Sequence, residues 1–413
     1  MPRAFVFLLL PILAQAAGVT AFLNARVIDG TGSPAIEKAT ILIRDGKIAA
    51  VGKKVKIPKD AERIDASGKT ILPGLVNAHG HVSTVDQMKV YLRDGITTLW
   101  SLGDTCPDAR KKTGACNSEF ESRDQSRRAV PGTLPRLYVA GPVITSTTPD
   151  DARKAVRDLV PQKPDVIKFR EDDALGTRPK MNPETYAALI DEAHRAGFRV
   201  ASHIVTLDDA KGVLKAGADF IAHSVRDREI DDEFIRLMKQ RGIFYCPTFT
   251  REISVFIYAE PPVFFKDPFF LKEADPAEIA RMSDPKLQQT MRTDKAALWY
   301  KEHLDVAMRN LKKAFAAGIG IAMGTDTGGG TGRFQGFFEH LELEYEVNAG
   351  LTPMQAIVSA TTGAAKAMKL DDQIGSLLPG RQADLLILTA NPLDDIRNTR
   401  RIDSVWVAGA RVR

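Results

Sequence analysis

Two histidines stand one residue apart, at His79 and His81, inside the stretch LPGLVNAHGHV over residues 72–82. A strand sends successive side chains to opposite faces, so residues i and i+2 point the same way. If this stretch ends a buried strand, both imidazoles face one point in space, as the ligands of a metal ion must. Taken alone, the pair fits equally well with two core histidines that bind backbone groups.

Four further polar residues follow the same pattern, because each stands at or near the end of an apolar run that predicts a buried strand. They are Lys168 in DVIKFR, His203 in RVASH, His223 in DFIAH and Asp326 in IAMGTD. In a barrel of parallel strands, the carboxyl ends of all strands meet at one mouth. The sequence therefore predicts that the candidate metal ligands and one lysine converge there.

Lys168 is the most informative of these residues, since it shares a strand face with Val166 and Arg170 and would point among histidines. A charged ammonium group in that place would be costly to desolvate and would repel metal cations. A buried lysine with a lowered pKa can instead add CO2 and become a carbamate, whose two oxygens can bridge two metal ions. The alternative is an ion pair between Lys168 and a carboxylate such as Asp172.

The middle of the chain, residues 75–370, has the rhythm that would position these groups. Apolar runs alternate with amphipathic segments that end at glycine, as in LMKQRGIFYC and AFAAGIGIAMGTD, which is typical of a helix followed by a strand. About eight such units predict an α/β fold with a (β/α)8 TIM barrel, and a doubly wound sheet is the alternative. The strands are expected near residues 76, 96, 137, 166, 200, 220, 243 and 319.

Three other segments depart from this rhythm. Short strands and turns in residues 18–74 and 371–413 predict a small composite β-sandwich built from both ends of the chain. Residues 250–299, rich in Phe, Pro and charge, are expected to form a lid-like insertion at the barrel mouth, or an oligomer contact.

The first 17 residues resemble a targeting segment rather than part of the fold. They combine an early arginine, a short apolar run and the pattern Ala-Gln-Ala, which predicts a cleavable signal peptide and an exported, periplasmic or secreted protein. An apolar run of about ten residues is too short to span a bilayer, so no stable membrane anchor is expected.

Composition narrows the class of partner. The 413-residue chain is 44% hydrophobic and 26% charged, with a modest net charge of +5. Its lysines and arginines are interspersed with aspartates and glutamates and form no basic stripe, so no nucleic-acid partner is expected. The expected substrate is a small molecule or short peptide, and the expected assembly is a homo-oligomer. Cys106 and Cys116 flank a polar loop that a disulfide could close in an oxidising compartment.

As a set, these motifs resemble the amidohydrolase superfamily, in its imidazolonepropionase-like and prolidase-like branch with a binuclear metal centre. The resemblance rests on PGLVNAHGHV, the fourth-strand lysine, the histidines that end the next two strands, GTD, and the tail GSLLPGRQADLLIL. It covers nearly the whole mature chain. It implies two divalent metal ions, with zinc as the first choice, and CO2 bound as a carbamate on Lys168.

The resemblance also implies a role for each ligand. His79, His81 and Asp326 would hold one metal, and His203 and His223 the other, with carboxylated Lys168 and a hydroxide as bridges. Such a pair of metals lowers the pKa of the shared water and polarises a carbonyl oxygen. Asp326 would be the catalytic residue that takes the proton and delivers it to the leaving amine.

The expected reaction is hydrolysis of an amide bond in a peptide or N-acyl amino acid. A lactonase or esterase on the same centre, a mononuclear deaminase, and a metal-free binding protein descended from an enzyme are the alternatives. The loop after Lys168 lacks the TGG stretch of dipeptidase-like relatives, and the sixth strand ends AHS where relatives have EHG. A peptide substrate therefore does not follow from the motifs.

Substrate contacts are less clearly marked than ligands. Arg170, Arg226 and Arg228 lie close in sequence to the ligands, and an arginine fork could hold a substrate carboxylate, although nearby acids offer ordinary ion pairs. Tyr245 could line an apolar wall or simply pack in the core. His340 corresponds to a histidine that recurs in relatives, which implies a supporting role behind the ligands.

Overall fold

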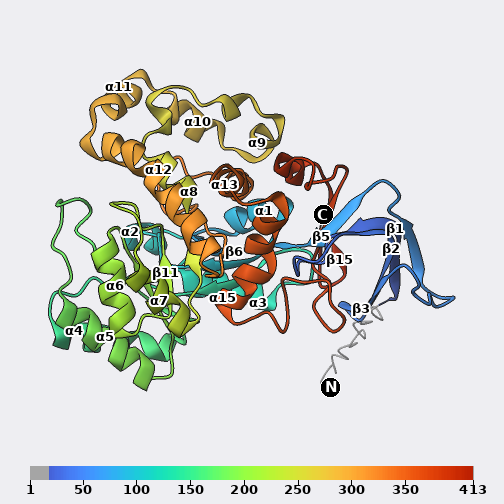
Figure 1. Cartoon of the computed structure of the whole chain (residues 1–413), viewed down its shortest axis with the longest axis horizontal. Coiled ribbons are helices and arrows are strands. Elements are labelled where there is room, and N and C mark those ends of the chain that lie inside the picture. The colour runs from blue at the N-terminus through green and yellow to red at the C-terminus, as the bar shows by residue number, and fades with distance from the viewer. Residues whose placement is uncertain (1–17, 413) are drawn as a thin grey trace, which may run out of the picture.

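The computed structural model describes residues 18–412, and the predicted signal peptide lies outside them. Figure 1 shows two parts: helices surrounding short parallel strands, and a sheet beside them that contains both ends of the described chain. The expected α/β class is confirmed. No helix in residues 18–412 has the length and apolar character needed to cross a bilayer.

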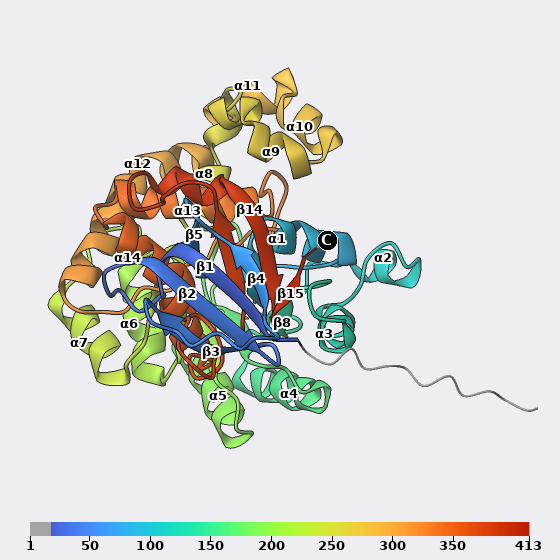
Figure 2. The ribbon, with the colours of Figure 1, turned by 90° about the vertical axis from the view of Figure 1, so that its right-hand side faces the viewer.

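The sheet beside the helices joins residues from the start and the finish of the chain (Figure 2). Its strand order is β15-β14-β13-β5-β1-β2-β3, and β4 pairs with β1. The join is the antiparallel pairing of β13 with β5, in which Ile387 lies opposite Ile71. Its strands are β1 (Thr20–Val27), β2 (Ile36–Arg44), β3 (Lys47–Gly52), β4 (Glu62–Asp65), β5 (Thr70–Pro73), β13 (Leu385–Leu388), β14 (Ile402–Val407) and β15 (Ala410–Arg411).

One face of this sheet is buried by alternating apolar residues, including Phe22 and Trp406, whose rings meet edge to face at 5.1 Å. The two chain ends thus meet in one sheet, as the sequence predicted. A second packed layer, which the expected sandwich requires, is not resolved as a separate sheet within residues 18–412.

Parallel strands form the centre of the other part, in two sheets with the orders β6-β7-β8 and β12-β11-β10-β9. Neither sheet reverses its strand order, as a doubly wound sheet would. Their positions match the predicted ones to within two residues. The strands are β6 (Leu75–Gly80), β7 (Ile96–Ser101), β8 (Arg136–Val139), β9 (Ile167–Arg170), β10 (Val200–His203), β11 (Phe220–Ala222) and β12 (Tyr245–Cys246).

The eighth predicted strand, near Ile319, is an extended segment and not a regular strand. Its Ile321 makes an isolated parallel bridge to Tyr245, and its Thr327 makes one to Gly80. The segment therefore connects β12 to β6, at the place where the eighth strand of a barrel would lie.

The ladder of this segment is interrupted where it carries a candidate ligand. The amides of Thr325 and Asp326 both donate to the carbonyl oxygen of His79, at 2.9 and 2.7 Å, and Asp326 adopts a φ of +58°. Two amides on one carbonyl bend the chain, so regular pairing stops there. On the other side, an isolated bridge from Ile144 to Phe169 links the neighbourhood of β8 to β9.

Helices follow most of the parallel strands, and many begin at a polar cap such as Thr84, Thr148 or Asn182, which satisfies free amides of the first turn. They are α1 (Val85–Arg93), α2 (Asp108–Lys112), α3 (Glu119–Arg128), α4 (Pro149–Leu159), α5 (Pro183–Arg195), α6 (Leu207–Ala216), α7 (Asp232–Arg241), α12 (Lys295–Ala316), α13 (Phe337–Asn348), α14 (Pro353–Val358) and α15 (Ala364–Met368).

The predicted insertion is helical, and Figure 1 shows α9, α10 and α11 as a layer beyond α12 and α13, whereas α8 lies against α12 and α13. It contains α8 (Phe249–Ser254), α9 (Pro268–Glu273), α10 (Pro276–Met282) and α11 (Pro285–Thr293). An aromatic cluster fastens it to the start of α13, since the ring of Phe264 lies 5.1 Å from those of Phe270 and Phe337. The insertion is therefore packed against the segment that follows Asp326.

Candidate metal centre

The two histidines of β6 are buried and held by different partners. The amide of His79 donates to Asn77 Oδ1 at 2.9 Å. His81 Nδ1 lies 2.7 Å from the carbonyl oxygen of Gly103, so this nitrogen carries the proton and Nε2 keeps its lone pair. That Nε2 lies 2.6 Å from Asp326 Oδ1, and His79 Nε2 lies 3.3 Å from the same oxygen.

The last residue of β10, His203, and the residue that follows β11, His223, complete a tight group. The ring centroids of His203 and His223 are 4.1 Å apart, and those of His79 and His223 are 4.6 Å apart. His223 Nδ1 lies 2.8 Å from Thr248 Oγ1. Ligand atoms of His79, His223 and Asp326 lie within 4.8 Å of one another. The structure thus brings together the histidines and the aspartate that the sequence singled out.

The backbone around this group is strained at three places. His223, Thr248 and Asp326 have φ values of +80°, +53° and +58°, a region that residues other than glycine enter at a cost of about 1–3 kcal/mol each. Such strain gathers where a fold must aim side chains at one point, and here it affects two candidate ligands and the partner of one.

Lys168 lies among these groups with a side chain only 2% exposed, and its Nζ has no hydrogen-bond partner in the described chain. Burial lowers the pKa of Lys168 to about 7. The alternative pairing with Asp172 is not formed, because that carboxylate lies 3.1 Å from His203 Nε2 and 3.5 Å from Arg170 Nε.

The protonation states suit metal binding. Burial, followed by the charge of Lys168, lowers the pKa of His79 to about 3. Burial also holds the pKa values of His203 and His223 well below the ordinary value, so the imidazoles are neutral near pH 7. Burial alone would raise the pKa of Asp326, but Arg333 and the two β6 histidines hold it well below its usual range.

Neutral imidazoles, one carboxylate and one buried amine without a partner form a donor set that fits divalent metal ions of the zinc type. His79 Nδ1 is a second buried atom without a partner among the described residues. Most buried polar atoms in proteins have a partner. The group therefore fits the metal-dependent chemistry that the sequence predicts.

A cavity of about 390 Å³ opens onto these ligands, and it is lined by His81, Gly103, Asp104, Thr105, Val143, Thr145, Arg170, His203, Arg251, Asp326, Gly329 and Arg333. Of the expected substrate contacts, Arg170 lies in this lining. Arg251 and Arg333 were not predicted, although both follow the carboxyl end of a strand or extended segment, the same signal that identified the ligands.

Arg226 and Arg228 do not line the cavity, contrary to expectation. Arg226 is 1% exposed and pairs with Glu252 at 2.9 Å, so it serves a buried ion pair. Arg228 is half exposed and pairs with Asp227 at 3.0 Å and with Asp208. Both arginines form ion pairs with nearby acidic residues, which was the alternative to substrate binding.

Tyr245 and His340 also lie away from the cavity lining. The Tyr245 hydroxyl accepts the amide of Val225 at 3.0 Å inside the core. His340 lies 2.9 Å from Thr399 Oγ1 and 2.8 Å from the carbonyl oxygen of Asp94. The expected place of His340 behind the ligands is therefore corrected: it ties α13 to the C-terminal segment and to the end of α1.

Three buried glutamates, which sequence reasoning missed, support the strand ends. We call Glu119, Glu339 and Glu342 the supporting carboxylates, and each accepts hydrogen bonds from three donors. The donors are Ser101 Oγ, Gly103 N and Gly141 N for Glu119; Asn77 Nδ2, Thr325 Oγ1 and Thr327 Oγ1 for Glu339; and Phe249 N, Thr250 N and Thr250 Oγ1 for Glu342.

The loop between β7 and α3 forms one wall of the cavity through Gly103, Asp104 and Thr105. The disulfide that the sequence left open, between Cys106 and Cys116, is formed in this loop, with Cα atoms 5.9 Å apart. It joins two points of a loop whose Gly103 carbonyl also orients His81.

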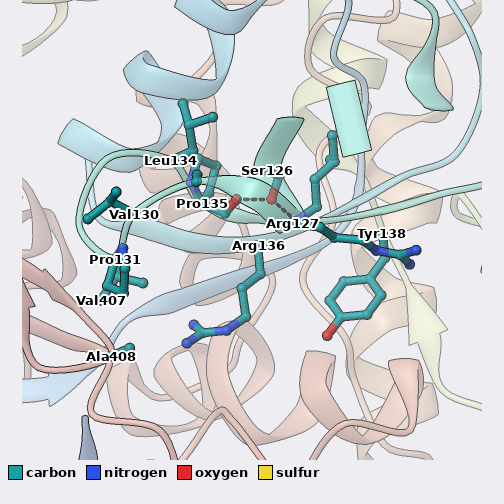
Figure 3. Close-up of a pocket in the computed structure, with 12 residues that line it drawn as sticks. Ser126, Arg127, Val130, Pro131, Leu134, Pro135, Arg136, Tyr138, Val407 and Ala408 are labelled. Atoms are coloured by element: carbon teal, nitrogen blue, oxygen red, sulfur yellow. Dashed lines mark hydrogen bonds between the residues drawn. The ribbon is translucent and has the colours of Figure 1, made fainter. Parts of the chain in front are cut away.

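Figure 3 shows a different cavity, of about 270 Å³, between the α3–β8 connection and the turn after β14. Ser126 Oγ donates to the carbonyl oxygen of Pro135 at 2.7 Å and accepts the amide of Leu137 at 3.1 Å. Arg136 pairs with Asp384. Ser126, Arg127 and Arg136 thus have partners within the protein, and none of the candidate ligands lines this cavity.

Comparisons with known proteins agree on the family and on the fold. The sequence profile of the amidohydrolase family matches residues 70–412. Ochratoxinase from Aspergillus niger is 24% identical, over 95% of this chain and 86% of that protein, and imidazolonepropionase from Caldanaerobacter subterraneus is 22% identical, over 87% and 86%. The solved structure of a Xaa-Pro dipeptidase with bound methionine superimposes with a TM-score of 0.75 at 22% identity, covering 96% of this chain and all of that one.

Proposed function

Because the chain belongs to the amidohydrolase family, as its motifs predicted, we propose that it hydrolyses an amide bond in a peptide or N-acyl amino acid. The observation that carries this proposal is the convergence of four buried histidines and Asp326 around Lys168, whose buried amine has no partner in the described chain. The donor set of this group fits divalent cations.

The residues fit two divalent ions, with zinc as the first choice. His79, His81 and Asp326 would hold one ion, and His203 and His223 the other. Lys168 would bridge them after capture of CO2, because an amine with a pKa of about 7 is largely uncharged and nucleophilic at mildly basic pH. Bound metals of this kind lower the pKa of a water and polarise the carbonyl group of a substrate.

Asp326 is the proposed catalytic residue. Its carboxylate is held ionised by Arg333 and the β6 histidines, and it lies on the cavity wall. It would accept the proton of the attacking water and pass it to the departing amine, which must be protonated to leave. The support of Thr325 and Thr327 by Glu339 fixes the turn that carries Asp326.

The surroundings of the site fit this proposal as well. We propose that the two parallel sheets and residues 319–327 close into the predicted barrel, since isolated bridges join their edges. An exported, homo-oligomeric protein without a nucleic-acid partner stays our proposal, and the disulfide supports an oxidising compartment.

The first test is metal content by mass spectrometry, for protein produced with zinc and bicarbonate, beside the variant Lys168→Ala. We expect two metals per chain in the wild type and one or none in the variant. One metal or fewer in the wild type, unmoved by the substitution, would contradict the binuclear centre and favour a mononuclear deaminase.

The second test is a substrate panel of dipeptides, N-acyl amino acids and matched lactones, assayed with the metal-loaded protein. Hydrolysis of the amides above the lactones is the expected result. Preferential hydrolysis of lactones would keep the metal centre and overturn the proposed bond.

A further inference from the structure

Arg333 occupies the junction between the metal cavity and a second cleft. It lines both the cavity that contains Asp326 and a neighbouring cleft of about 600 Å³ between α1, α10 and residues 328–337. Its Nη1 donates to Asp326 Oδ2, and its Nε donates to Ser254 Oγ at 3.1 Å. Its side chain is 15% exposed, so the guanidinium depends on Asp326 for charge compensation.

Glycines place Arg333 this close to the ligands. A Cβ atom on Gly329 would lie 2.8 Å from Asp326 Oδ1 and 2.9 Å from His81 Cδ2. Only a residue without a side chain lets the loop pass against both groups. The loop therefore delivers Arg333 to the same carboxylate that the proposed metal needs.

The other charges of the cavity offer Arg333 no replacement partner. Asp104 already pairs with Lys111 at 2.9 Å. Arg251, which lines the same cavity, lies 3.2 Å from Glu252, and that carboxylate also serves a buried arginine of the core. Among the described residues that line the metal cavity itself, no carboxylate is left for a second guanidinium.

A divalent cation bound to Asp326 would weaken the charge compensation between Asp326 and Arg333. A carboxylate that coordinates a metal neutralises a neighbouring guanidinium only in part, and the two cations repel each other. A buried arginine without an anion is strongly unfavourable. The metal-loaded cavity thus has an unmet requirement for one negative charge next to Arg333 and Arg251.

We propose that Arg333 exchanges partners: it holds Asp326 in the metal-free protein and binds a carboxylate of the substrate in the metal-loaded protein, beside Arg251. The inference rests on the proposed function and deepens it, because it assigns the substrate class and the residue that selects it. A planar carboxylate fits, since the guanidinium fork binds that group through two parallel hydrogen bonds.

The first measurement concerns the metal-free state. Zinc affinity would be measured by competition with a chromophoric chelator for the wild type, Arg333→Met and Arg333→Lys. Loss of the competing ion pair should tighten zinc binding about tenfold in Arg333→Met, with a smaller change in Arg333→Lys. Arg309→Met is the matched control, because Arg309 is exposed and pairs with Glu229 at 3.0 Å. Equal or weaker zinc binding by a well-folded Arg333→Met would overturn the exchange.

The second measurement concerns the metal-loaded state. Calorimetry would compare the binding of N-benzoyl-L-phenylalanine with that of the matched alcohol, N-benzoyl-L-phenylalaninol, to the zinc-loaded protein. The wild type and Arg309→Met should prefer the carboxylate by about tenfold or more, as expected for a charge-assisted pair. Arg333→Met should lose that preference.

The outcomes separate this inference from the proposed function. A preference retained in Arg333→Met, or no binding of the carboxylate probe by the wild type, would overturn the carboxylate role of Arg333. If the binding results hold while the wild type cleaves no amide in the panel, the proposed function fails and the exchange of Arg333 stands.

Discussion

The candidate ligands and the supporting carboxylates are equally buried, yet they differ in how their polar atoms are satisfied. Glu119, Glu339 and Glu342 are fully buried, and each receives three hydrogen bonds from its own chain. Lys168 is 2% exposed, and its amine has no partner in the described chain. The carboxylates are held by several donors of the fold, although Glu339 Oε2 has no partner in the described chain, whereas the only polar atom of the Lys168 side chain has none.

The difference teaches which buried polar groups serve structure and which serve chemistry. The supporting carboxylates lie on regular helices and connect strand ends to one another. The ligand region contains residues with strained φ angles, such as His223 and Asp326. A fold tolerates strain and unpaired atoms where other parts hold them in place. The comparison predicts opposite responses to substitution in the two regions.

The largest expected effect is on activity in the ligand region. Replacement of Asp326 by Asn should lower kcat by at least about 10³-fold, because it removes both a metal ligand and the proposed base. The rate would be measured on the best amide of the panel with zinc-loaded protein, and circular dichroism would verify folding. A folded Asp326→Asn variant with ordinary activity would contradict the assignment of Asp326.

The next effect is on stability in the supporting region. Glu119→Ala should lower the free energy of unfolding by about 3 kcal/mol, because it leaves buried donors such as the Gly103 and Gly141 amides without acceptors. Denaturant titration gives the value. Glu119→Gln is the matched control, since it keeps an acceptor and should lose less. If both variants unfolded like the wild type, the supporting role of Glu119 would be wrong.

A change in the ligand region should have the opposite sign. Lys168→Met should raise the free energy of unfolding of the metal-free protein by about 2 kcal/mol at pH 7, because it removes a buried polar group without a partner. The same denaturant titration, in the presence of a chelator, measures this. A destabilised Lys168→Met variant would show that Lys168 has a partner in the folded protein.

The smallest effect, taken per pH unit, is the dependence of stability on pH. The pKa of Lys168 falls from 10.5 in the unfolded chain to about 7 in the folded one, so the unfolded chain binds more protons between these values. Lys168 should therefore add up to about 1.4 kcal/mol of stability per unit of rising pH in this window. The contribution of Lys168 to this slope is obtained by measuring the free energy of unfolding at several pH values and subtracting the slope of Lys168→Met from that of the wild type.

The supporting carboxylates should give a slope of the other sign. Burial raises the pKa of Glu119 from 4.5 to about 7, so its stabilising contribution is present below pH 4.5 and is lost as the pH rises through 7. Comparison of Glu119→Gln with the wild type between these values measures that slope. Equal signs for Lys168 and Glu119 would remove the contrast between the two regions.

The positions of the candidate ligands could be predicted because their signal is local: an apolar run followed by a polar residue marks the carboxyl end of a buried strand. The roles of Arg226 and Glu339 could not, because they depend on partners distant in sequence. Arg226 is taken up by Glu252, and Glu339 reaches Asn77 across 262 positions. The irregularity of the predicted eighth strand could not be foreseen for the same reason. It arises where the amides of Thr325 and Asp326 both donate to the carbonyl oxygen of His79, which is distant in sequence.

The Cys106–Cys116 bridge has a practical consequence for anyone who purifies this protein. Thr105 lines the metal cavity, so the bridge begins one residue from its wall. A chain made in a reducing cytoplasm, or handled in dithiothreitol, would carry two free thiols there, and thiolates bind zinc strongly. The zinc measured in such preparations would include metal bound by the two reduced cysteines as well as metal bound by the candidate ligands. Periplasmic expression and thiol-free buffers are therefore the conditions under which the zinc stoichiometry can be interpreted.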